Sequence, residues 1–408
     1  MSLSLPDEER DALGEGLTPV QAARAAPKPM RVLVLGLRGV VNVQGGIETH
    51  ARMLYPLLVR MGYRVEVVQR SQYFPRKSRL REWHGVKLTY MWSPRKPGLE
   101  AAVHSVLGLA YAALTRPDVL HLHAIGPAFL APLARLLGLR VVVTHHAEDY
   151  RREKWKGLAR TILKLGERLG MRYAHERIVV SSVLRERMTS KYGVNVNFIP
   201  NGAPRALRTQ GRSTLERFGL SDSRYILCVA RLEMTKRQLD LIDAFEMADL
   251  PGWKLALVGG LDLRDSYCRE LRRRASANPR IVLTGFQRGV SLRELYSHCR
   301  MFVLPSSMEG HPIALLEALS YGVPVLASAI PENLILPIPR NCFFNVGDTS
   351  ELARLMTRMA NAENDVEKAR LAVRERYSWR RAAELTRLVY ESVLAGQAAR
   401  SRRVHEAS

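Results

Sequence analysis

The sequence predicts an α/β protein made of two tandem, doubly wound Rossmann-like domains. The chain has 408 residues, which is longer than one hydrophobic core usually grows. Short apolar runs alternate with stretches long enough for helices, a pattern typical of a parallel sheet covered on both faces. This alternation starts again near Tyr225, after a turn-rich segment. Two consecutive domains of one architecture are therefore expected.

The first half opens with a βαβ pattern. It follows residues 1–29, which lack apolar periodicity and are expected to be a disordered leader. An apolar run over 31–36 ends in glycine, residues 47–60 repeat apolar side chains at helical spacing, and strand character returns over 64–68. Further strands are expected over 119–122, 141–144, 178–180 and 197–199. We assign 30–202 to an N-terminal domain.

The second half repeats the alternation. Strands are expected over 225–230, 254–258, 281–284, 301–304 and 323–327. The turn-rich segment from Pro200 to Pro204 marks the break between the domains. We assign 203–378 to a C-terminal domain. Residues 379–408 are expected to form a C-terminal helix followed by a basic tail.

The charge balance favours anionic partners. The chain carries 62 Lys and Arg against 39 Asp and Glu, a formal net charge of +23. Such a surface attracts phosphorylated small molecules, nucleic acid or an anionic membrane. Charge alone does not choose among these three classes.

The cysteines and the absence of targeting signals indicate a cytoplasmic protein. The four cysteines are far apart and lack metal-site spacing, so we expect reduced core residues: Cys228, Cys268, Cys299 and Cys342. The acidic N-terminus has no apolar stretch, and therefore no secretory signal is expected. The longest apolar run, 101–114, is shorter than the ~20 residues of a spanning helix.

The most informative segment is EGHPIALLEALSYGVPVLAS, over 309–328. Glu309 is expected on the loop after the 301–304 strand, at the end where open α/β sheets bind ligands. Pro312 suits the first turn of a helix, which places Glu317 about one and a half turns into it. The free N–H groups of that helix can receive phosphate, and a deeper carboxylate can accept hydrogen bonds from a ribose diol. The segment predicts a nucleotide-sugar site.

This segment closely resembles the E-x7-E signature of the large retaining glycosyltransferase family numbered four, including its ALxxGxPVxAS continuation. The resemblance implies the GT-B fold, with a donor cleft between two domains and a C-terminal helix, within 379–408, that packs back across both. It also implies that Glu317 holds the ribose and Glu309 sits near the donor sugar. The neighbouring residues expected to bind the donor are Gly310, His311, Pro312 and Ile313.

A basic pair completes the donor site. Arg231 and Lys236 stand five apart after a strand, as in the family's GRLxxxKG segment. Paired cations stabilise the charge that develops on a leaving diphosphate. Since no D-x-D triplet occurs, we expect no metal and no other cofactor. Arg237 replaces the family's usual glycine, which leaves the loop geometry open, and both basic residues as plain surface charges are the alternative.

Two stretches of the first domain resemble donor-binding motifs. Gly45 and Gly46 match the family's GG-x-E, which flanks the donor diphosphate, although many βα loops carry glycine. THHAEDYRREKW resembles a rhamnosyltransferase-like bacterial subgroup, which implies that His146 faces the donor sugar near its C6 region and that Asp149 binds the donor. Ala147 stands where that subgroup has glycine. His145 is expected to be structural, and a core or surface role for both histidines stays open.

The expected reaction is transfer from a nucleoside-diphosphate sugar to a saccharide acceptor, with retention. The family resemblance implies front-face displacement, in which the donor phosphate assists acceptor deprotonation. A sugar-nucleotide epimerase of the same fold is the alternative enzyme, and a basic membrane or nucleic-acid binding protein is the alternative class. A dinucleotide oxidoreductase is disfavoured because G-x-G-x-x-G is missing.

Two basic segments suggest where the enzyme works. Residues 70–98 hold eight bases against one acid, with Tyr73, Phe74, Trp83 and Trp92 among them. Residues 151–177 hold nine bases against three acids along a helix-like stretch. Basic and aromatic residues together suit the inner face of the plasma membrane, with a lipid-linked acceptor for a surface polysaccharide such as exopolysaccharide, O-antigen or capsule. The alternative is a solvated basic face; nucleic acid is not an expected partner.

Overall fold

The computed structural model describes residues 29–96, 98–153, 155–362 and 365–406, so the expected leader lies outside the described residues apart from Pro29. The chain divides into two compact units. The N-unit comprises the described residues up to Asn201 together with Trp379–Glu406, and the C-unit comprises Gly202–Ser378. The crossings between units lie after Asn201 and after Ser378.

The N-unit is built on one eight-stranded sheet in the order β3-β4-β2-β1-β5-β6-β7-β8. Its strands are β1 (Arg31–Leu35), β2 (Arg64–Arg70), β3 (Glu82–Trp83), β4 (Val86–Met91), β5 (Val119–His123), β6 (Val141–His145), β7 (Glu176–Val179) and β8 (Asn197–Phe198). All neighbours pair in parallel except β3 and β4. The order reverses between β1 and β5, which makes their carboxyl ends a switch point.

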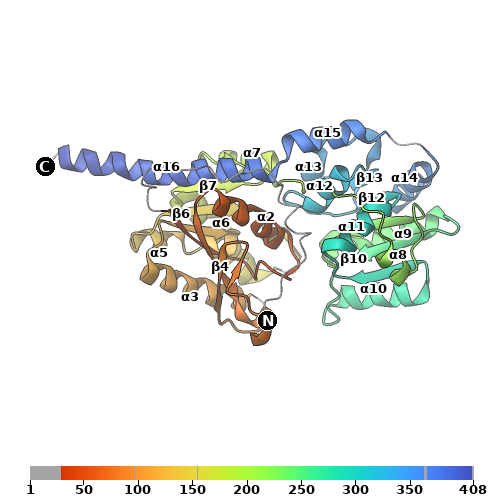
Figure 1. The fold of residues 1–408 in the computed structure, drawn as a ribbon, viewed down its shortest axis with the longest axis horizontal. Helices are drawn as coiled ribbons and strands as arrows, with labels where there is room; N and C mark the ends of the chain where they lie inside the picture. Colours follow the sequence, from red (N-terminus) through yellow and green to blue (C-terminus); the bar gives the residue numbers. More distant parts are fainter. Residues whose placement is uncertain (1–28, 97, 154, 363–364, 407–408) are drawn as a thin grey trace. The chain divides into compact units, whose positions relative to one another are not determined.

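Helices cover both faces of this sheet (Figure 1). They are α2 (Gly46–Arg60), α3 (Leu99–Thr115), α4 (Ile125–Ala128), α5 (Ala131–Leu136), α6 (Gly157–Tyr173), α7 (Ser182–Tyr192) and α16 (Trp379–Glu406). The C-terminal helix α16 packs against α2, and Tyr390 on α16 reaches into the core. The helix that follows the C-unit in sequence therefore completes the fold of the N-unit.

The basic segment over 70–98 contributes some of its side chains to the core of the N-unit. It contains two short 3-10 turns, η1 (Ser71–Tyr73) and η2 (Arg76–Ser78), and the β3–β4 hairpin at the sheet edge. Phe74 and Trp83 are buried and Tyr90 is half-buried, so only two of its five aromatic side chains are exposed. Arg79 is half-buried because it donates to the carbonyl oxygens of Ser71 and Phe74. Phe74 and Trp83 therefore belong to the core and not to an interfacial surface, while the membrane role expected for the segment stays a prediction.

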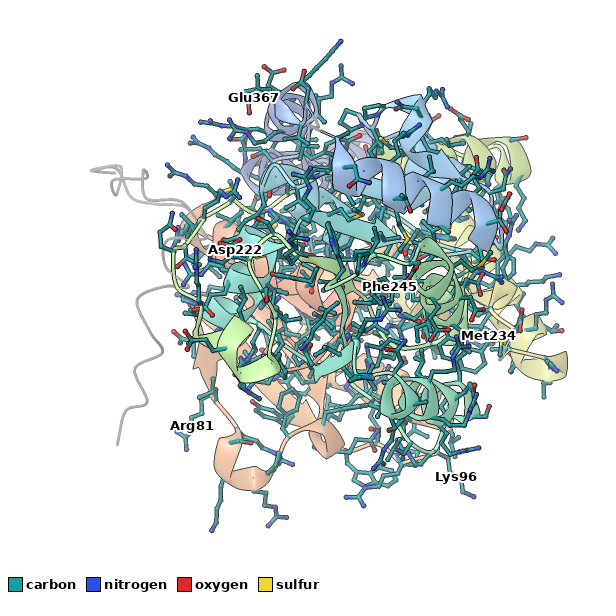
Figure 2. The ribbon with its side chains drawn as sticks, turned by 90° about the vertical axis from the view of Figure 1, so that its right-hand side faces the viewer. Arg81, Lys96, Asp222, Met234, Phe245 and Glu367 are labelled. Carbon is teal, nitrogen blue, oxygen red and sulfur yellow. The ribbon has the colours of Figure 1, made fainter. Side chains whose placement is uncertain are left out.

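The C-unit is built on a six-stranded, all-parallel sheet in the order β11-β10-β9-β12-β13-β14. Its strands are β9 (Tyr225–Val229), β10 (Lys254–Val258), β11 (Ile281–Gly285), β12 (Met301–Leu304), β13 (Val325–Ser328) and β14 (Phe343–Phe344). The side chains of β9 alternate between two cores, with Leu227 on one face and Ile226 on the other. Phe245, labelled in Figure 2, fills the second core.

Helices again cover both faces of the sheet. They are α8 (Ser213–Phe218), α9 (Gln238–Ala248), α10 (Ser266–Ala277), α11 (Gly289–His298), α12 (Ile313–Ser320), α13 (Pro331–Leu334), α14 (Thr349–Asn361) and α15 (Glu367–Arg376), with 3-10 turns η4 (Met234–Lys236) and η5 (Arg340–Cys342). Three of the four cysteines are buried, and Cys342 is half-buried. The two Rossmann-like domains predicted from the sequence are confirmed.

Candidate active site

The C-unit has its own switch point, between β9 and β12. The loop after β9 carries Arg231, and the loop after β12 carries Glu309. The loop after β10 approaches the same edge closely, because a Cβ on Gly259 would lie 2.2 Å from the carbonyl oxygen of Ala230. The fold thus gathers the predicted donor residues at the carboxyl ends of neighbouring strands.

Lys236 and Glu309 form an ion pair at this edge. The Lys236 Nζ lies 2.6 Å from Glu309 Oε1, and the side chains are only 12% and 10% exposed. Lys236 ends η4, which begins at the exposed Met234 labelled in Figure 2. An ion pair held this far from water is strengthened by the low local dielectric. Two residues that stand 73 positions apart thus meet directly.

Arg237 follows Lys236, at the position where the family usually has glycine. Arg237 has φ 50°, in the left-handed region that favours glycine. Its guanidinium pairs with Asp240 in the first turn of α9, which fixes the loop in this conformation. The loop therefore keeps the shape that glycine would favour, with an arginine in its place.

Arg231 lies beside a different carboxylate. Its guanidinium is 3.0 Å from Glu233 Oε1, and its side chain is 28% exposed. The Thr235 hydroxyl donates to the same oxygen of Glu233. The sequence prediction did not include Glu233, because an acid between two bases has no distinctive spacing.

Glu317 is the fifth residue of α12 and lies beside a buried tyrosine. Its Oε2 accepts a hydrogen bond of 3.0 Å from the Tyr296 hydroxyl of α11. The Tyr296 ring stacks on Tyr321, with centroids 5.3 Å apart, so the hydroxyl that holds Glu317 is itself fixed in place. This carboxylate is pre-oriented by its surroundings.

The residues between the two glutamates begin the same helix. Pro312 is the N-cap of α12, one residue earlier than the first-turn position expected for it, and Ile313 starts the helix. His311 is buried, and burial lowers its pKa to about 3, so its ring is neutral. Gly310 is half-buried on the preceding loop. The free N–H groups of the helix start suit an anion.

The glycine loop of the N-unit is organised by an arginine that the sequence analysis missed. Gly45 is the N-cap of α2, and Gly46 is its first residue. Arg38 pairs with Glu48 at 3.0 Å and donates to the Gln44 carbonyl oxygen at 2.6 Å. A Cβ on Gly46 would meet no described atom within 4 Å, so its backbone faces open space. The loop is braced by Arg38 from within, while Gly46 itself is exposed.

The structure separates His146 from Asp149. His146 is buried, and its Nε2 lies 2.8 Å from His123 Nδ1. Asp149 begins η3 (Asp149–Arg151) and pairs with Arg152 at 2.9 Å. His146 thus belongs to a buried histidine cluster, whereas Asp149 belongs to a half-exposed turn.

His145 has the structural role expected for it. Its Nε2 lies 2.9 Å from Glu167, and both side chains are fully buried. Lys191 and Tyr192 also donate to this carboxylate. Burial alone would raise the pKa of Glu167, but these donors lower it to about 2. The group holds α6 against β6 and α7.

The histidine cluster comprises His50, His121, His123 and His146, and it lies next to the β1–β5 switch point. Burial lowers the pKa of His50 to about 4 and that of His121 to about 3. Burial, together with neighbouring histidines, also lowers the pKa values of His123 and His146 well below 6.5. All four rings are therefore neutral near pH 7.

One sequence signal could have revealed this cluster. His121 and His123 stand two apart at the end of β5, so both project to the same face of the sheet. The next residue, Ala124, has φ 69°, an unfavourable value for a non-glycine residue that marks a constrained site. His50 could not be linked to them, because only the packing of α2 brings it close.

Two family descriptions match the chain. Residues 44–206 match "Glycosyltransferase Family 4", and residues 215–376 match "Glycosyl transferases group 1". The first match falls mainly in the N-unit and the second wholly in the C-unit. The two matches together span most of the chain.

Curated relatives point the same way. The chain is 25% identical to an uncharacterized glycosyltransferase of Methanocaldococcus jannaschii, over 86% of this chain and 95% of that protein. It is 33% identical to the GDP-mannose-dependent alpha-(1-6)-phosphatidylinositol monomannoside mannosyltransferase of Mycolicibacterium smegmatis, over 49% of this chain and 55% of the relative. The chain thus spans about half the length of that mannosyltransferase.

Solved structures share the fold. Sucrose-phosphate synthase of Thermosynechococcus elongatus aligns with a TM-score of 0.69 and 20% identity, covering 93% of this chain and all of that chain. HepE of Anabaena, solved with UDP and glucose, aligns with a TM-score of 0.70 and 18% identity, covering 89% of this chain and all of HepE. Within the described residues, no helix has the length and apolarity needed to cross a membrane. The chain is a glycosyltransferase of the GT-B fold and the family-four type.

Proposed function

We propose that this protein transfers a sugar from a nucleoside-diphosphate sugar to a lipid-linked saccharide, with retention of configuration. The observation that carries the proposal is that Lys236 and Glu309 pair between the loops that follow β9 and β12, the two strands of the C-unit switch point. Arg231 lies on the first of these loops, and Glu317 lies on α12, which follows the second. The mannosyltransferase relative is named for phosphatidylinositol monomannoside and for its dependence on GDP-mannose, which supports this class of reaction.

The charges of the C-unit suit the leaving group. In the reaction, the bond between the anomeric carbon and the diphosphate oxygen breaks, and the acceptor oxygen bonds to the same face of that carbon. The acceptor proton passes to the departing phosphate. Arg231 and Lys236 stabilise the negative charge that develops there. Lys236 is held by Glu309 at 2.6 Å, so the diphosphate competes with this carboxylate for it.

The ribose and sugar are held by separate groups. Glu317, oriented by Tyr296, accepts hydrogen bonds from the ribose diol. Glu309 sits near the sugar, and Gly310, His311, Pro312 and Ile313 line the donor. That Gly45, Gly46, His146 and Asp149 also contact the donor remains a prediction.

Product stereochemistry tests this proposal. Purified protein is incubated with UDP-, GDP- and dTDP-sugars and a lipid-linked saccharide acceptor. The anomeric configuration of donor and product is then compared by proton NMR. We expect transfer from at least one donor with unchanged configuration. An inverted product would contradict retention, and interconversion of the donor sugar without transfer would favour an epimerase.

We also propose that no divalent cation bridges the donor diphosphate, because Arg231 and Lys236 already supply positive charge there. Turnover should therefore survive EDTA. Activity that is lost in EDTA and restored by Mg²⁺ or Mn²⁺ would contradict this proposal. Restoration by Zn²⁺ alone would point to a different metal site, away from the diphosphate.

The amphipathic helix α6 is the proposed membrane-binding surface on the cytoplasmic, inner face of the plasma membrane. Its exposed apolar residues follow helical spacing: Leu158 (75% exposed), Ile162 (43%) and Leu165 (40%). Arg160, Lys164 and Arg168 are exposed on the same helix. An apolar stripe beside cations is typical of a helix lying in the headgroup region.

The basic segment over 70–98 adds further exposed cations to the N-unit. Arg76, Lys77, Arg81 and Lys96 are all exposed, and Figure 2 shows Arg81 and Lys96 pointing outward. Each cation near an anionic surface contributes about 1 kcal/mol. We therefore expect binding that weakens with salt.

Liposome flotation tests the membrane surface. Vesicles with anionic lipid should carry the wild-type protein at low salt. Replacing Arg160, Lys164 and Arg168 by serine should abolish this, and replacing Arg269, Arg272 and Arg273 of the C-unit should not, although the charge change is the same. Equal loss in both variants would show attraction by net charge alone. No binding of the wild type would remove the membrane role.

A further inference from the structure

Three histidines of the N-unit converge from separate elements. His50 lies on α2, His123 ends β5, and His146 follows β6. One ring nitrogen of each lies within 4.8 Å of the corresponding nitrogens of the other two. All three side chains are buried, at 3%, 0% and 7% exposure. Converging imidazole nitrogens in a buried site are the usual ligands of zinc and related ions.

The hydrogen bond that His50 makes through Nδ1 leaves its other ring nitrogen, Nε2, with a lone pair. His50 Nδ1 lies 2.8 Å from Asn201 Oδ1, and an amide oxygen only accepts, so Nδ1 carries the proton. Nε2 is then an acceptor, and it has no hydrogen-bond partner within the described part of the chain. A buried nitrogen left in this state is costly, and coordination of a cation would satisfy it. Asn201 has the role that outer hydrogen-bond partners play at metal sites.

One arrangement of protons satisfies the neighbouring groups and leaves a second lone pair in the same place. His121 Nε2 donates to Thr144 Oγ1 at 2.7 Å, and His121 Nδ1 accepts from the Tyr390 hydroxyl at 2.7 Å and from Tyr55 at 3.2 Å. The Tyr55 oxygen is then free to accept from His123 Nε2. His123 Nδ1 therefore presents its lone pair to His146.

We propose that His50 Nε2, His123 Nδ1 and His146 Nε2 bind one zinc-class divalent cation, for which His146 moves the proton of its hydrogen bond to His123 from Nε2 to Nδ1 and stays neutral. Three nitrogen ligands leave one position of a tetrahedral ion open. Zinc–nitrogen bonds of about 2.0–2.1 Å place ligand nitrogens about 3.3 Å apart. The His123–His146 pair, now 2.8 Å apart, would open by about half an ångström while His50 moves inward. Imidazole ligands favour Zn²⁺, Co²⁺, Ni²⁺ or Cu²⁺ over Mg²⁺ and Ca²⁺.

The site would also fasten the two ends of the N-unit. Asn201 is the last residue before the chain leaves this unit, and Trp379 is the first after it returns. The His50 ring packs against Trp379, with centroids 5.6 Å apart, and hydrogen-bonds to Asn201. Metal binding at His50 would therefore stabilise both crossings. This inference stands independently of the proposed transferase reaction.

Metal binding by the full-length, tag-free protein tests the site. The protein is stripped with a chelator, checked for folding by circular dichroism, and titrated with Zn²⁺ and with Co²⁺. We expect one ion per chain by elemental analysis, the visible absorption of tetrahedral cobalt, and a melting temperature that rises with Zn²⁺. None of these readouts requires catalytic activity.

Three variants sharpen this test. His50→Gln should weaken Zn²⁺ binding by about 100-fold or more, and Asn201→Ala, which removes only the outer hydrogen bond, by about 10- to 100-fold. His104→Leu, a buried histidine of α3, should bind Zn²⁺ as the wild type does. If His50→Gln fails to fold, Asn201→Ala carries the comparison.

Two outcomes would overturn the proposal. A folded wild-type protein that takes up no stoichiometric Zn²⁺ and shows no tetrahedral cobalt spectrum would make the cluster a hydrogen-bonded network only. Wild-type affinity in both His50→Gln and Asn201→Ala would place the bound ion on other residues.

Discussion

The two units share an architecture but hold their polar groups in opposite ways. At the C-unit switch point, charged residues on loops form short, partly exposed ion pairs such as Lys236–Glu309. At the N-unit switch point, neutral rings such as His123 are buried and joined by hydrogen bonds. The first arrangement can exchange its partners for an anionic ligand. In the second arrangement, the buried rings resist protonation and are held in a fixed geometry by their hydrogen bonds.

This difference separates two kinds of polar site. Loop cations such as Arg231 retain access to solvent, so their removal should affect chemistry more than folding. Groups such as Glu167 are enclosed by their partners, so their removal should affect folding first. Mutations and pH changes can test this division.

The largest expected effect is on transfer by Arg231→Ala. Loss of a cation that stabilises the leaving diphosphate costs about 2–4 kcal/mol in the transition state, or roughly 30- to 1000-fold in kcat. Steady-state kinetics measures this, and the melting temperature should hardly change. Arg273→Ala, which removes an exposed arginine of the same unit, is the control. If Arg231→Ala and Arg273→Ala had equal kinetics, the role of Arg231 in stabilising the leaving diphosphate would be contradicted.

The next effect concerns Glu167 of the N-unit. Glu167→Ala should lower the free energy of unfolding by about 3 kcal/mol, because it leaves the buried His145 and the half-buried Tyr192 without the carboxylate that they contact. Urea unfolding measures the loss, and Glu167→Gln should recover part of it. Unfolding unchanged by Glu167→Ala would show that the buried network of the N-unit contributes little.

Acidification should destabilise the N-unit through its histidines. Burial lowers the pKa of His50 to about 4, whereas an unfolded histidine titrates near 6.5. The unfolded chain therefore binds more protons below pH 6.5. Stability is complete above pH 6.5 and falls as the pH drops toward 4; His50 alone costs about 2 kcal/mol at pH 5. Urea unfolding at pH 7 and pH 5 measures the loss, and His50→Gln should show a smaller one. Equal stability at both pH values would contradict neutral, buried rings.

The smallest effect is expected at Arg237. Arg237→Gly removes the cost of a left-handed arginine, about 1 kcal/mol, and also loses the pair with Asp240. We therefore expect stability within about 1 kcal/mol of wild type and kcat close to wild type. Thermal melting and kinetics measure both. A large loss of activity would show that the Arg237 guanidinium itself takes part in the site.

The fold and the C-unit site were largely accessible from the sequence. Strand periodicity located both sheets, and the spacing of Glu309 and Glu317 placed them on a loop and a helix as expected. Motifs of this kind lie within one βα unit, where local spacing determines geometry. For the same reason, the Lys236–Glu309 contact across two loops was not predicted.

The N-unit site was accessible only in part. His146 was singled out, but its partners His50 and His123 come from other elements and converge only through packing. In the basic segment over 70–98, Phe74 and Trp83 were expected on an interfacial surface, but both side chains enter the core. Composition identified the charge of that segment but not which of its side chains face solvent.

The central claim is that the C-unit binds a nucleoside diphosphate through Glu317 and the basic pair. A thermal-shift panel with UDP, GDP and dTDP tests it most directly, using wild type and Glu317→Gln. We expect at least one nucleotide to stabilise the wild type, by about 2.7 kcal/mol at 100 times its Kd, and to stabilise Glu317→Gln much less at the same concentration. Stabilisation by none of the three, or equal stabilisation of both proteins, would contradict the claim.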